Sequence, residues 1–209
     1  VIALTGGIGS GKTYVASIFD KLGSIPCFYS DLEAKKIMNE DNQVKKEVIS
    51  ILGPESYVNN NLNPQFLRDQ IFYSQNKLKK INDLVHNKVR TNFKKWLDNQ
   101  GSKYVLKETA ILFEHNYDRD VDLSILIIAP LKVRIERIIK RDNISQNKIE
   151  KIISNQWDDK KKLHLSDYFI ENINKSNTIK KVEDLIEVFS VIWIKTILYL
   201  IINISLTLF

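Results

Sequence analysis

One glycine-rich stretch near the start of the chain constrains its fold more than any other feature. Residues 6–13, GGIGSGKT, match the pattern G-x-x-x-x-G-K-[ST] in full. An apolar run over residues 1–4 precedes this stretch, and helical periodicity follows it from about Lys12 to Leu22. Between a strand and a helix, such a loop wraps its backbone N–H groups around phosphate oxygens. The sequence therefore predicts a nucleotide-binding P-loop rather than a glycine-rich turn without a ligand.

The residue types of this loop each have a chemical role. The glycines let the backbone approach the β-phosphate, and the helix N-terminus adds partial positive charge. Lys12 can reach the β- and γ-phosphate oxygens of ATP, and the Thr13 hydroxyl is the expected ligand of Mg²⁺. The predicted nucleotide-binding residues in this part of the chain are Gly7, Ile8, Gly9, Ser10, Gly11, Lys12, Thr13 and Tyr14.

Apolar strands alternate with helices along most of the chain. Strands are predicted at about 1–4, 25–28, 104–108, 123–128 and 169–170, and helices at about 12–22, 32–39, 43–52, 64–97 with a break near Ser74, 130–141, 145–155 and from 179. This alternation predicts a three-layer α/β fold of the P-loop NTPase type, with a parallel five-stranded sheet flanked by helices. Residues 40–100 interrupt the alternation with helices and a Gly-Pro and Asn-rich loop, and we interpret them as an inserted helical substrate subdomain.

The composition limits which cellular compartment and which binding partners are expected. The lone cysteine, Cys27, excludes an intrachain disulfide and favours a reducing, cytoplasmic location. The net charge of +6 fits anionic nucleotide substrates or a Lys-rich surface alone. The sequence has no basic stripe with interleaved aromatic residues, so nucleic-acid binding is not predicted. The sequence does not begin with Met, so we expect a few residues to precede Val1.

Motifs of other P-loop classes are missing. The GTPase motif N-K-x-D is absent, since Asn87 and Lys88 are followed by Val89 and Arg90. A motor ATPase needs a longer chain than these 209 residues. The sequence thus favours a small-molecule kinase, although a P-loop alone does not fix the reaction.

A series of further motifs resembles the dephospho-CoA kinase family, in the order of that family, over residues 1–190. They are TGGIGSGKT at 5–13, Ser30-Asp31 after the second strand, FLRDQIF at 66–72, LVH at 84–86, AILFE at 110–114, the pair Arg137 and Arg141-Asp142, and Gln156 with LSDYFIEN at 165–172. The chain departs from the family where Tyr29 replaces the first acid of D-x-D, and where Asn87 and Ala110 replace prolines of H-P and P-L-L.

The resemblance implies transfer of the ATP γ-phosphoryl group to the ribose 3′-hydroxyl of dephospho-CoA, which yields coenzyme A, with Mg²⁺ as cofactor. Asp31 is the implied base, and N-capping of the next helix is its alternative role. Arg137 and Arg141 would bind the ATP phosphates; they lie four residues apart, on one face of a lid helix within about 131–165. The three groups implied to act in catalysis are Asp31, Lys12 and Arg141. The alternative for the two arginines is a solvated face paired with Glu136 or Asp142.

The acceptor side is assigned by resemblance alone. Arg68 and His86 would lie near dephospho-CoA; otherwise they are a surface arginine and a structural histidine. Glu108 and Glu114 would arrange the acceptor or water around Mg²⁺; capping or surface roles are the alternative. Two other functions stay open, a different small-molecule kinase such as a nucleoside monophosphate kinase, and a nucleotide-binding module without catalysis. No obligate protein partner is predicted.

The C-terminal segment, residues 188–209, is apolar apart from Lys195 and a few uncharged polar residues. It could extend the last helix and pack on the domain, or lie outside the original gene. The third interpretation is a membrane anchor. The apolar segment is long enough to span a bilayer, but the polar Asn203, Ser205 and Thr207 argue against it. We therefore divide the chain into a kinase-like domain over 1–190 and a tail of uncertain role over 191–209.

Overall fold

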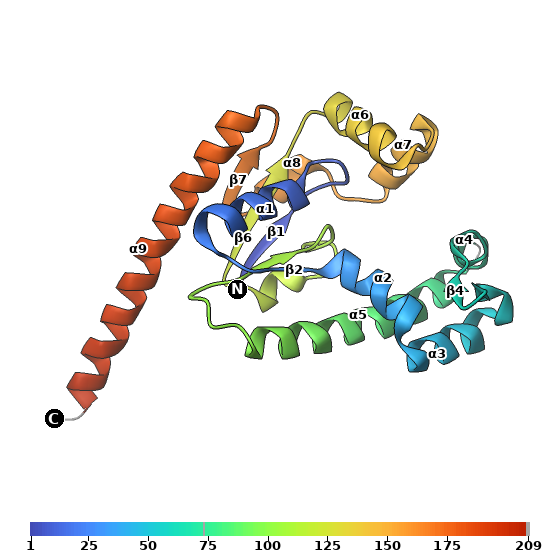
Figure 1. The fold of residues 1–209 in the computed structure, drawn as a ribbon, viewed down its shortest axis with the longest axis horizontal. Helices are drawn as coiled ribbons and strands as arrows, with labels where there is room; N and C mark the ends of the chain where they lie inside the picture. Colours follow the sequence, from blue (N-terminus) through green and yellow to red (C-terminus); the bar gives the residue numbers. More distant parts are fainter. Residues whose placement is uncertain (73, 208–209) are drawn as a thin grey trace. The chain divides into compact units, whose positions relative to one another are not determined.

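The computed structural model describes residues 1–72 and 74–207 (Figure 1). Its central sheet has five strands, which run in the order β2-β5-β1-β6-β7. Their bounds are β1 Ile2–Thr5, β2 Cys27–Tyr29, β5 Leu106–Glu108, β6 Leu123–Ile128 and β7 Tyr168–Glu171. The pairings of β1 with β5, of β1 with β6 and of β6 with β7 are parallel. The structure thereby confirms the predicted α/β fold.

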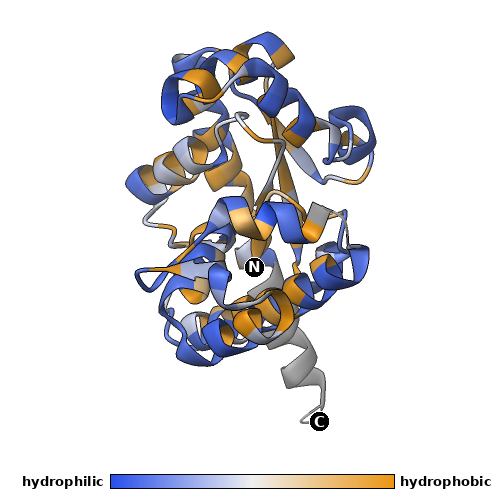
Figure 2. Cartoon of the chain, turned by 90° about the vertical axis from the view of Figure 1, so that its right-hand side faces the viewer, coloured by the Kyte–Doolittle hydropathy of each residue, from blue (hydrophilic) through white to orange (hydrophobic). Residues whose placement is uncertain are grey.

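The core of this sheet lies along β1 and β6. Ala3 and Leu4 of β1 and residues 125–127 of β6 are fully buried, as expected for parallel strands covered on both faces. Figure 2 shows the hydrophobic colour on strands and, in stripes, on the helices. On one face, α1 (Lys12–Gly23) packs on α9 (Lys175–Thr207). The rings of Phe19 and Phe189 stack there with centroids 6.4 Å apart.

The chain divides into two compact units, residues 1–27 with 101–209, and residues 28–100. The first unit also contains α6 (Leu131–Asp142), α7 (Gln146–Ser154), α8 (Asp159–Leu163) and the 3-10 turn η2 (Tyr117–Asp120). The second contains α2 (Ser30–Glu40), α3 (Asn42–Leu52), the 3-10 turn η1 (Pro54–Ser56), β3 (Tyr57–Val58), β4 (Asn61–Leu62), α4 (Pro64–Phe72) and α5 (Gln75–Asp98). We call the second the helical unit.

The helical unit has a core of its own. Ile37 of α2, Val48 of α3 and Val85, Val89 and Phe93 of α5 are buried. The predicted break near Ser74 is confirmed, because the Ser74 side chain accepts a hydrogen bond from Lys77 N and begins α5. Such a cap satisfies one of the amide donors that the first helical turn leaves unpaired.

Several elements differ from the sequence-based prediction. The predicted loop near Asn59 contains the antiparallel hairpin β3–β4, with Asn59 and Asn60 at φ 50° and 66°. Asparagine tolerates this left-handed conformation, which allows a two-residue turn. Helix α8 was missed because it has only five residues. Helix α9 begins four residues earlier than predicted, at Lys175. Helix α1 runs one residue beyond the predicted Leu22, to Gly23, and Ser24 follows it in the left-handed region.

The tail continues α9 as one helix as far as Thr207, and residues 208–209 lie outside the described residues. Val182, Leu185 and Phe189 of α9 are buried. Further along the same helix, Val191 and Ile194 are about half exposed, at 51% and 52%. Within the described part of the chain, no helix has both the length and the apolar character needed to cross a membrane.

Candidate active site

The P-loop leaves the carboxyl end of β1 and enters α1. Gly6, Gly9 and Gly11 have φ values of 146°, 79° and 93°, where residues with a Cβ are strained. A Cβ on Gly6 would also overlap the backbone oxygen of Ile127 in β6. Gly11 provides no side-chain cap for α1. The first amides of this helix therefore point towards the loop, where they can bind an anion.

Three predicted site residues meet at the start of α1. Lys12 is 8% exposed; its Nζ donates to Gly6 O at 3.0 Å and lies 3.9 Å from Glu108 Oε1. The Thr13 hydroxyl donates to Glu108 Oε2 at 3.3 Å. Glu108, at the end of β5, is 6% exposed. Tyr14 follows in the same helical turn and is half-buried.

A hydroxyl beside a buried carboxylate fits Mg²⁺, which prefers oxygen ligands and usually keeps several waters and substrate phosphates. The described residues contain no group of three or more His, Cys, Asp or Glu side chains that could hold a metal ion by themselves. Thr13 and Glu108 offer two oxygen ligands, and Mg²⁺ would take its other ligands from water and phosphate.

The two predicted lid arginines have different surroundings on α6. The Nη1 of Arg137 lies 3.3 Å from Ser10 O, and its Nη2 donates to Asn172 O at 2.9 Å. Arg137 therefore braces the backbone of the P-loop. Arg141 is exposed and paired with Asp142 at 2.7 Å. This hydrogen bond is the main cause that raises the pKa of Arg141, and the negative charge of Glu108 adds to it.

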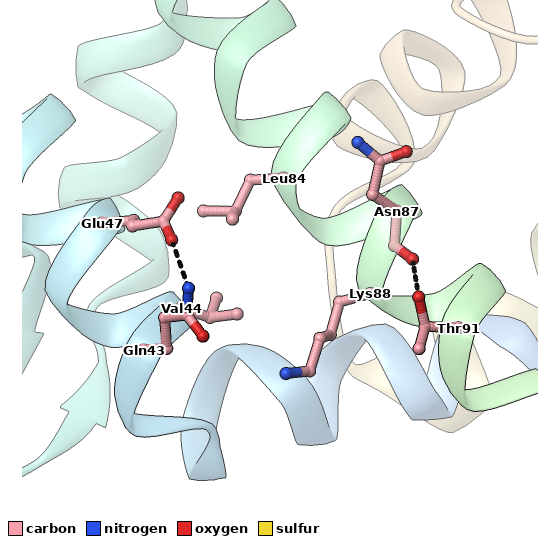
Figure 3. Close-up of a pocket in the computed structure, with 7 residues that line it drawn as sticks. All are labelled: Gln43, Val44, Glu47, Leu84, Asn87, Lys88 and Thr91. Atoms are coloured by element: carbon pink, nitrogen blue, oxygen red, sulfur yellow. Dashed lines mark hydrogen bonds between the residues drawn. The ribbon is translucent and has the colours of Figure 1, made fainter. Parts of the chain in front are cut away.

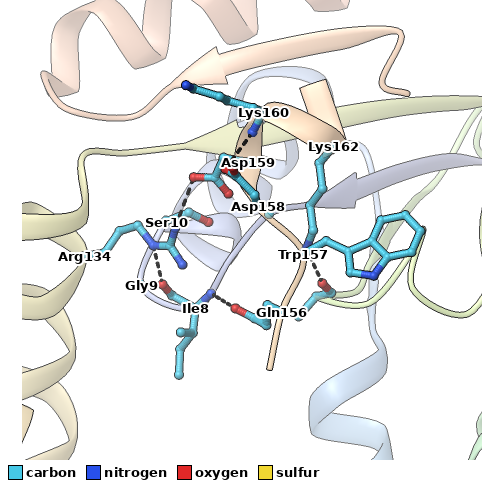
Figure 4. A network of polar contacts seen from close by, with 12 residues as sticks. Ile8, Gly9, Ser10, Arg134, Gln156, Trp157, Asp158, Asp159, Lys160 and Lys162 are labelled. Atoms are coloured by element: carbon cyan, nitrogen blue, oxygen red, sulfur yellow. Dashed lines mark hydrogen bonds and ion pairs between the residues drawn. The ribbon is translucent and has the colours of Figure 1, made fainter. Parts of the chain in front are cut away.

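A third arginine on α6 was missed by the sequence analysis. Arg134 is 6% exposed, donates from Nε to Ile8 O at 2.8 Å and pairs through Nη1 with Asp159 Oδ2 at 3.1 Å (Figure 4). Its spacing from Arg137 and Arg141, three and seven residues, places all three on one helix face. That periodicity was the signal available in the sequence.

Two residues quoted for the family motifs also bind the loop. Gln156 Oε1 accepts from Ile8 N at 2.9 Å (Figure 4). Asn172, just after β7 and 3% exposed, donates from Nδ2 to Ser10 O at 2.8 Å. Both residues belong to motifs that resemble the family, but neither was among the predicted site residues. They hold the loop from the side of α6–α8 and of β7, so the conformation of the P-loop depends on segments far away in the sequence.

Glu114 follows β5 and contacts the segment around α8. Its Oε1 is 2.6 Å from Lys162 Nζ and accepts from Trp157 N at 3.1 Å. Its Oε2 is buried and, among the described residues, has no hydrogen-bond partner. The structure therefore gives one oxygen of Glu114 a bracing contact and leaves the other for a donor.

The remaining predicted residues belong to the helical unit. Asp31 lies exposed in the first turn of α2, whose N-cap residue is Tyr29. The alternative of Asp31 as the N-cap is thus wrong. Arg68 is exposed on α4, and His86 is half-buried on α5. The role of Asp31 as base and the roles of Arg68 and His86 in acceptor binding stay predictions.

The helical unit also has an open pocket of about 190 Å³ between α3 and α5 (Figure 3). Its lining residues are Gln43, Val44, Glu47, Leu84, Asn87, Lys88 and Thr91. None of the predicted acceptor residues is among them. At its rim Lys88 pairs with Asp41 at 2.7 Å.

Comparison with known proteins decides the family. Residues 1–178 match the family model described as dephospho-CoA kinase. The chain belongs to the dephospho-CoA kinase family. The dephospho-CoA kinase of Bacteroides fragilis is 32% identical over 186 residues, 88% of this chain and 90% of the relative. That of Salinibacter ruber is 30% identical over 184 residues, 86% of this chain and 92% of the relative.

Solved structures share the fold of this family member. A crystal structure from Thermus thermophilus has a TM-score of 0.80 at 24% identity and covers 90% of this chain and 95% of its own. The dephospho-CoA kinase of Campylobacter jejuni has a TM-score of 0.57 at 20% identity, with coverages of 89% and 95%. Assignment to the dephospho-CoA kinase family also makes this chain a kinase, which uses ATP.

Proposed function

We propose that this protein transfers the γ-phosphoryl group of ATP to the 3′-hydroxyl of the ribose of dephospho-CoA, forming coenzyme A and ADP. One observation carries the proposal: in a chain of the dephospho-CoA kinase family, Lys12 and Thr13 of a P-loop meet the buried carboxylate of Glu108. This arrangement suits phosphoryl transfer, in which catalysis is positioning and charge neutralisation.

On the nucleotide side, the amides of residues 9–13 and the Lys12 ammonium would bind the phosphates. Lys12 would exchange its bond to Gly6 O for phosphate oxygens. The Thr13 hydroxyl and Glu108 would hold Mg²⁺, which neutralises charge on the β- and γ-phosphates. We further propose that Arg141, exposed on α6, closes over the triphosphate, while Arg137 keeps the loop backbone in place.

On the acceptor side, we assign the base to Asp31. Its carboxylate would accept the proton of the 3′-hydroxyl as the oxygen attacks phosphorus. Arg68 and His86, both in the helical unit, would bind the anionic acceptor, and Glu114 Oε2 is the buried oxygen left to accept a donor from it. The single cysteine and the family suit a cytoplasmic location.

The test is an ADP-release assay with purified protein, Mg²⁺ and ATP. We expect turnover with dephospho-CoA and none with coenzyme A, a matched control whose 3′-position already carries phosphate. Turnover with nucleoside monophosphates but not with dephospho-CoA would replace the proposal by another kinase activity. ATP binding without turnover on any acceptor would indicate a nucleotide-binding module.

A further inference from the structure

A buried ion pair anchors the segment between α7 and β7. Lys162 of α8 is fully buried, at 0% exposure, and its Nζ lies 2.6 Å from Glu114 Oε1. The same ammonium donates to Ala110 O at 3.2 Å, and Trp157 N donates to the same carboxylate oxygen at 3.1 Å. We call residues 156–162 the strap. The strap is thus fixed to the loop that follows β5 near both of its ends, at Trp157 and at Lys162.

The other contacts of the strap lead to the P-loop (Figure 4). Gln156 Oε1 accepts from Ile8 N at 2.9 Å. Asp159 pairs with Arg134 at 3.1 Å, and Arg134 donates to Ile8 O at 2.8 Å. Both backbone polar groups of Ile8 are therefore bound, one by the strap directly and one through Arg134.

Burying an ammonium and a carboxylate is costly, so such a pair is weak evidence for stability, and removing one partner leaves an uncompensated charge. We interpret this ion pair as fixing the position of the strap rather than as adding stability. Lys162 has two oxygen partners on residues 110–114. The backbone of Ile8 in the P-loop is bound by Gln156 of the strap and by Arg134, which pairs with the strap. A shift of the strap would move Ile8 and, with it, the amides that follow in the loop.

We propose that Lys162 is a positioning residue for the triphosphate site. Lys162 is fully buried against Glu114 and Ala110 and acts through the strap: by pinning the strap it sets the place of Ile8 and hence the spacing of the P-loop amides. The inference rests on the proposed function only for nucleotide binding, not for the identity of the acceptor. It adds Lys162 and Gln156 to the residues that determine affinity for ATP.

The test measures the Kd for Mg·ATP by calorimetry, without any acceptor, so that it does not depend on dephospho-CoA. Lys162→Met should raise this Kd on the order of tenfold, because small displacements of positioning groups have large effects. Lys162→Arg, which keeps a cation, should restore most of the affinity. Lys160→Met, an exposed lysine two residues away in the same helix, is the matched control and should bind as the wild type does.

A double-mutant cycle separates positioning from a general structural effect. Gln156→Ala should also raise the Kd for Mg·ATP, and Lys162→Met combined with Gln156→Ala should be little weaker than either single variant, since both act through one contact chain. Independent effects that multiply would overturn the proposal, because Lys162 would then act by another route.

If Lys162→Met does not fold, Glu114→Gln combined with Lys162→Met removes both charges and keeps an acceptor for Trp157 N. Circular dichroism would confirm its fold. We expect this double variant to show the weakened affinity for Mg·ATP. A folded double variant with the wild-type Kd would also overturn the proposal.

Discussion

At the scale of residues, Asp31 connects the proposed reaction to one carboxylate. It lies exposed in the first turn of α2 and is not the cap of that helix. Asp31→Asn should therefore leave folding and the Kd for Mg·ATP unchanged but remove most turnover, by 10²-fold or more as a rough expectation for a lost general base. Glu40→Gln, an exposed acid at the other end of α2, is the control in the same ADP-release assay. Unchanged turnover in Asp31→Asn would exclude this residue as the base.

At the scale of elements, the start of α3 depends on one side chain. Asp41 Oδ1 accepts from Gln43 N at 3.0 Å and Val44 N at 3.1 Å, and Oδ2 pairs with Lys88. Asp41→Ala should lower the free energy of unfolding by about 1 kcal/mol near pH 7, the usual cost of a lost cap. Asp41→Asn keeps the capping oxygen and should cost less. Urea unfolding followed by circular dichroism measures both.

The same carboxylate gives a pH dependence. The hydrogen bond with Lys88, followed by that with Val44 N, lowers the pKa of Asp41 below 3.8. A group whose pKa is lowered by folding stabilises the protein above its unfolded pKa, and this contribution is lost as pH falls through the folded pKa. The difference between wild type and Asp41→Asn should thus shrink as the pH is lowered from 7 to below 3.8. A difference that grows on acidification would contradict this assignment.

At the scale of the whole molecule, the two compact units suggest a division of labour. The P-loop and the strap belong to one unit, and Asp31, Arg68 and His86 belong to the helical unit. In hydrogen exchange, Mg·ATP alone should protect amides at 6–13 and 156–162, because bound ligand suppresses local opening. Dephospho-CoA alone should protect amides within 28–100. Lys12→Ala is the control for the first effect, and protection by dephospho-CoA restricted to the P-loop unit would refute the assignment of the helical unit.

Much of the secondary structure could be predicted because its signals are local. The apolar runs of β1 and β6, the break before Ser74 and the glycines of residues 6–13 fix backbone conformation within a few neighbouring residues. The short α8 and the hairpin at Asn59 carried no such periodicity. Two or five residues are too few for a helical or alternating pattern to be recognised.

The sequence by itself determined the P-loop, the alternation that leads to a parallel sheet, and the family, since each depends on residue types at short spacing. Only the tertiary structure decided which side chains hold the loop. Arg134, Gln156 and Lys162 lie more than a hundred residues from Ile8 along the chain, and their contacts exist because β1 and β6 pair in register and bring their following segments to one edge of the sheet. Burial requires these polar side chains to have partners, and no local sequence pattern encodes which partners they find.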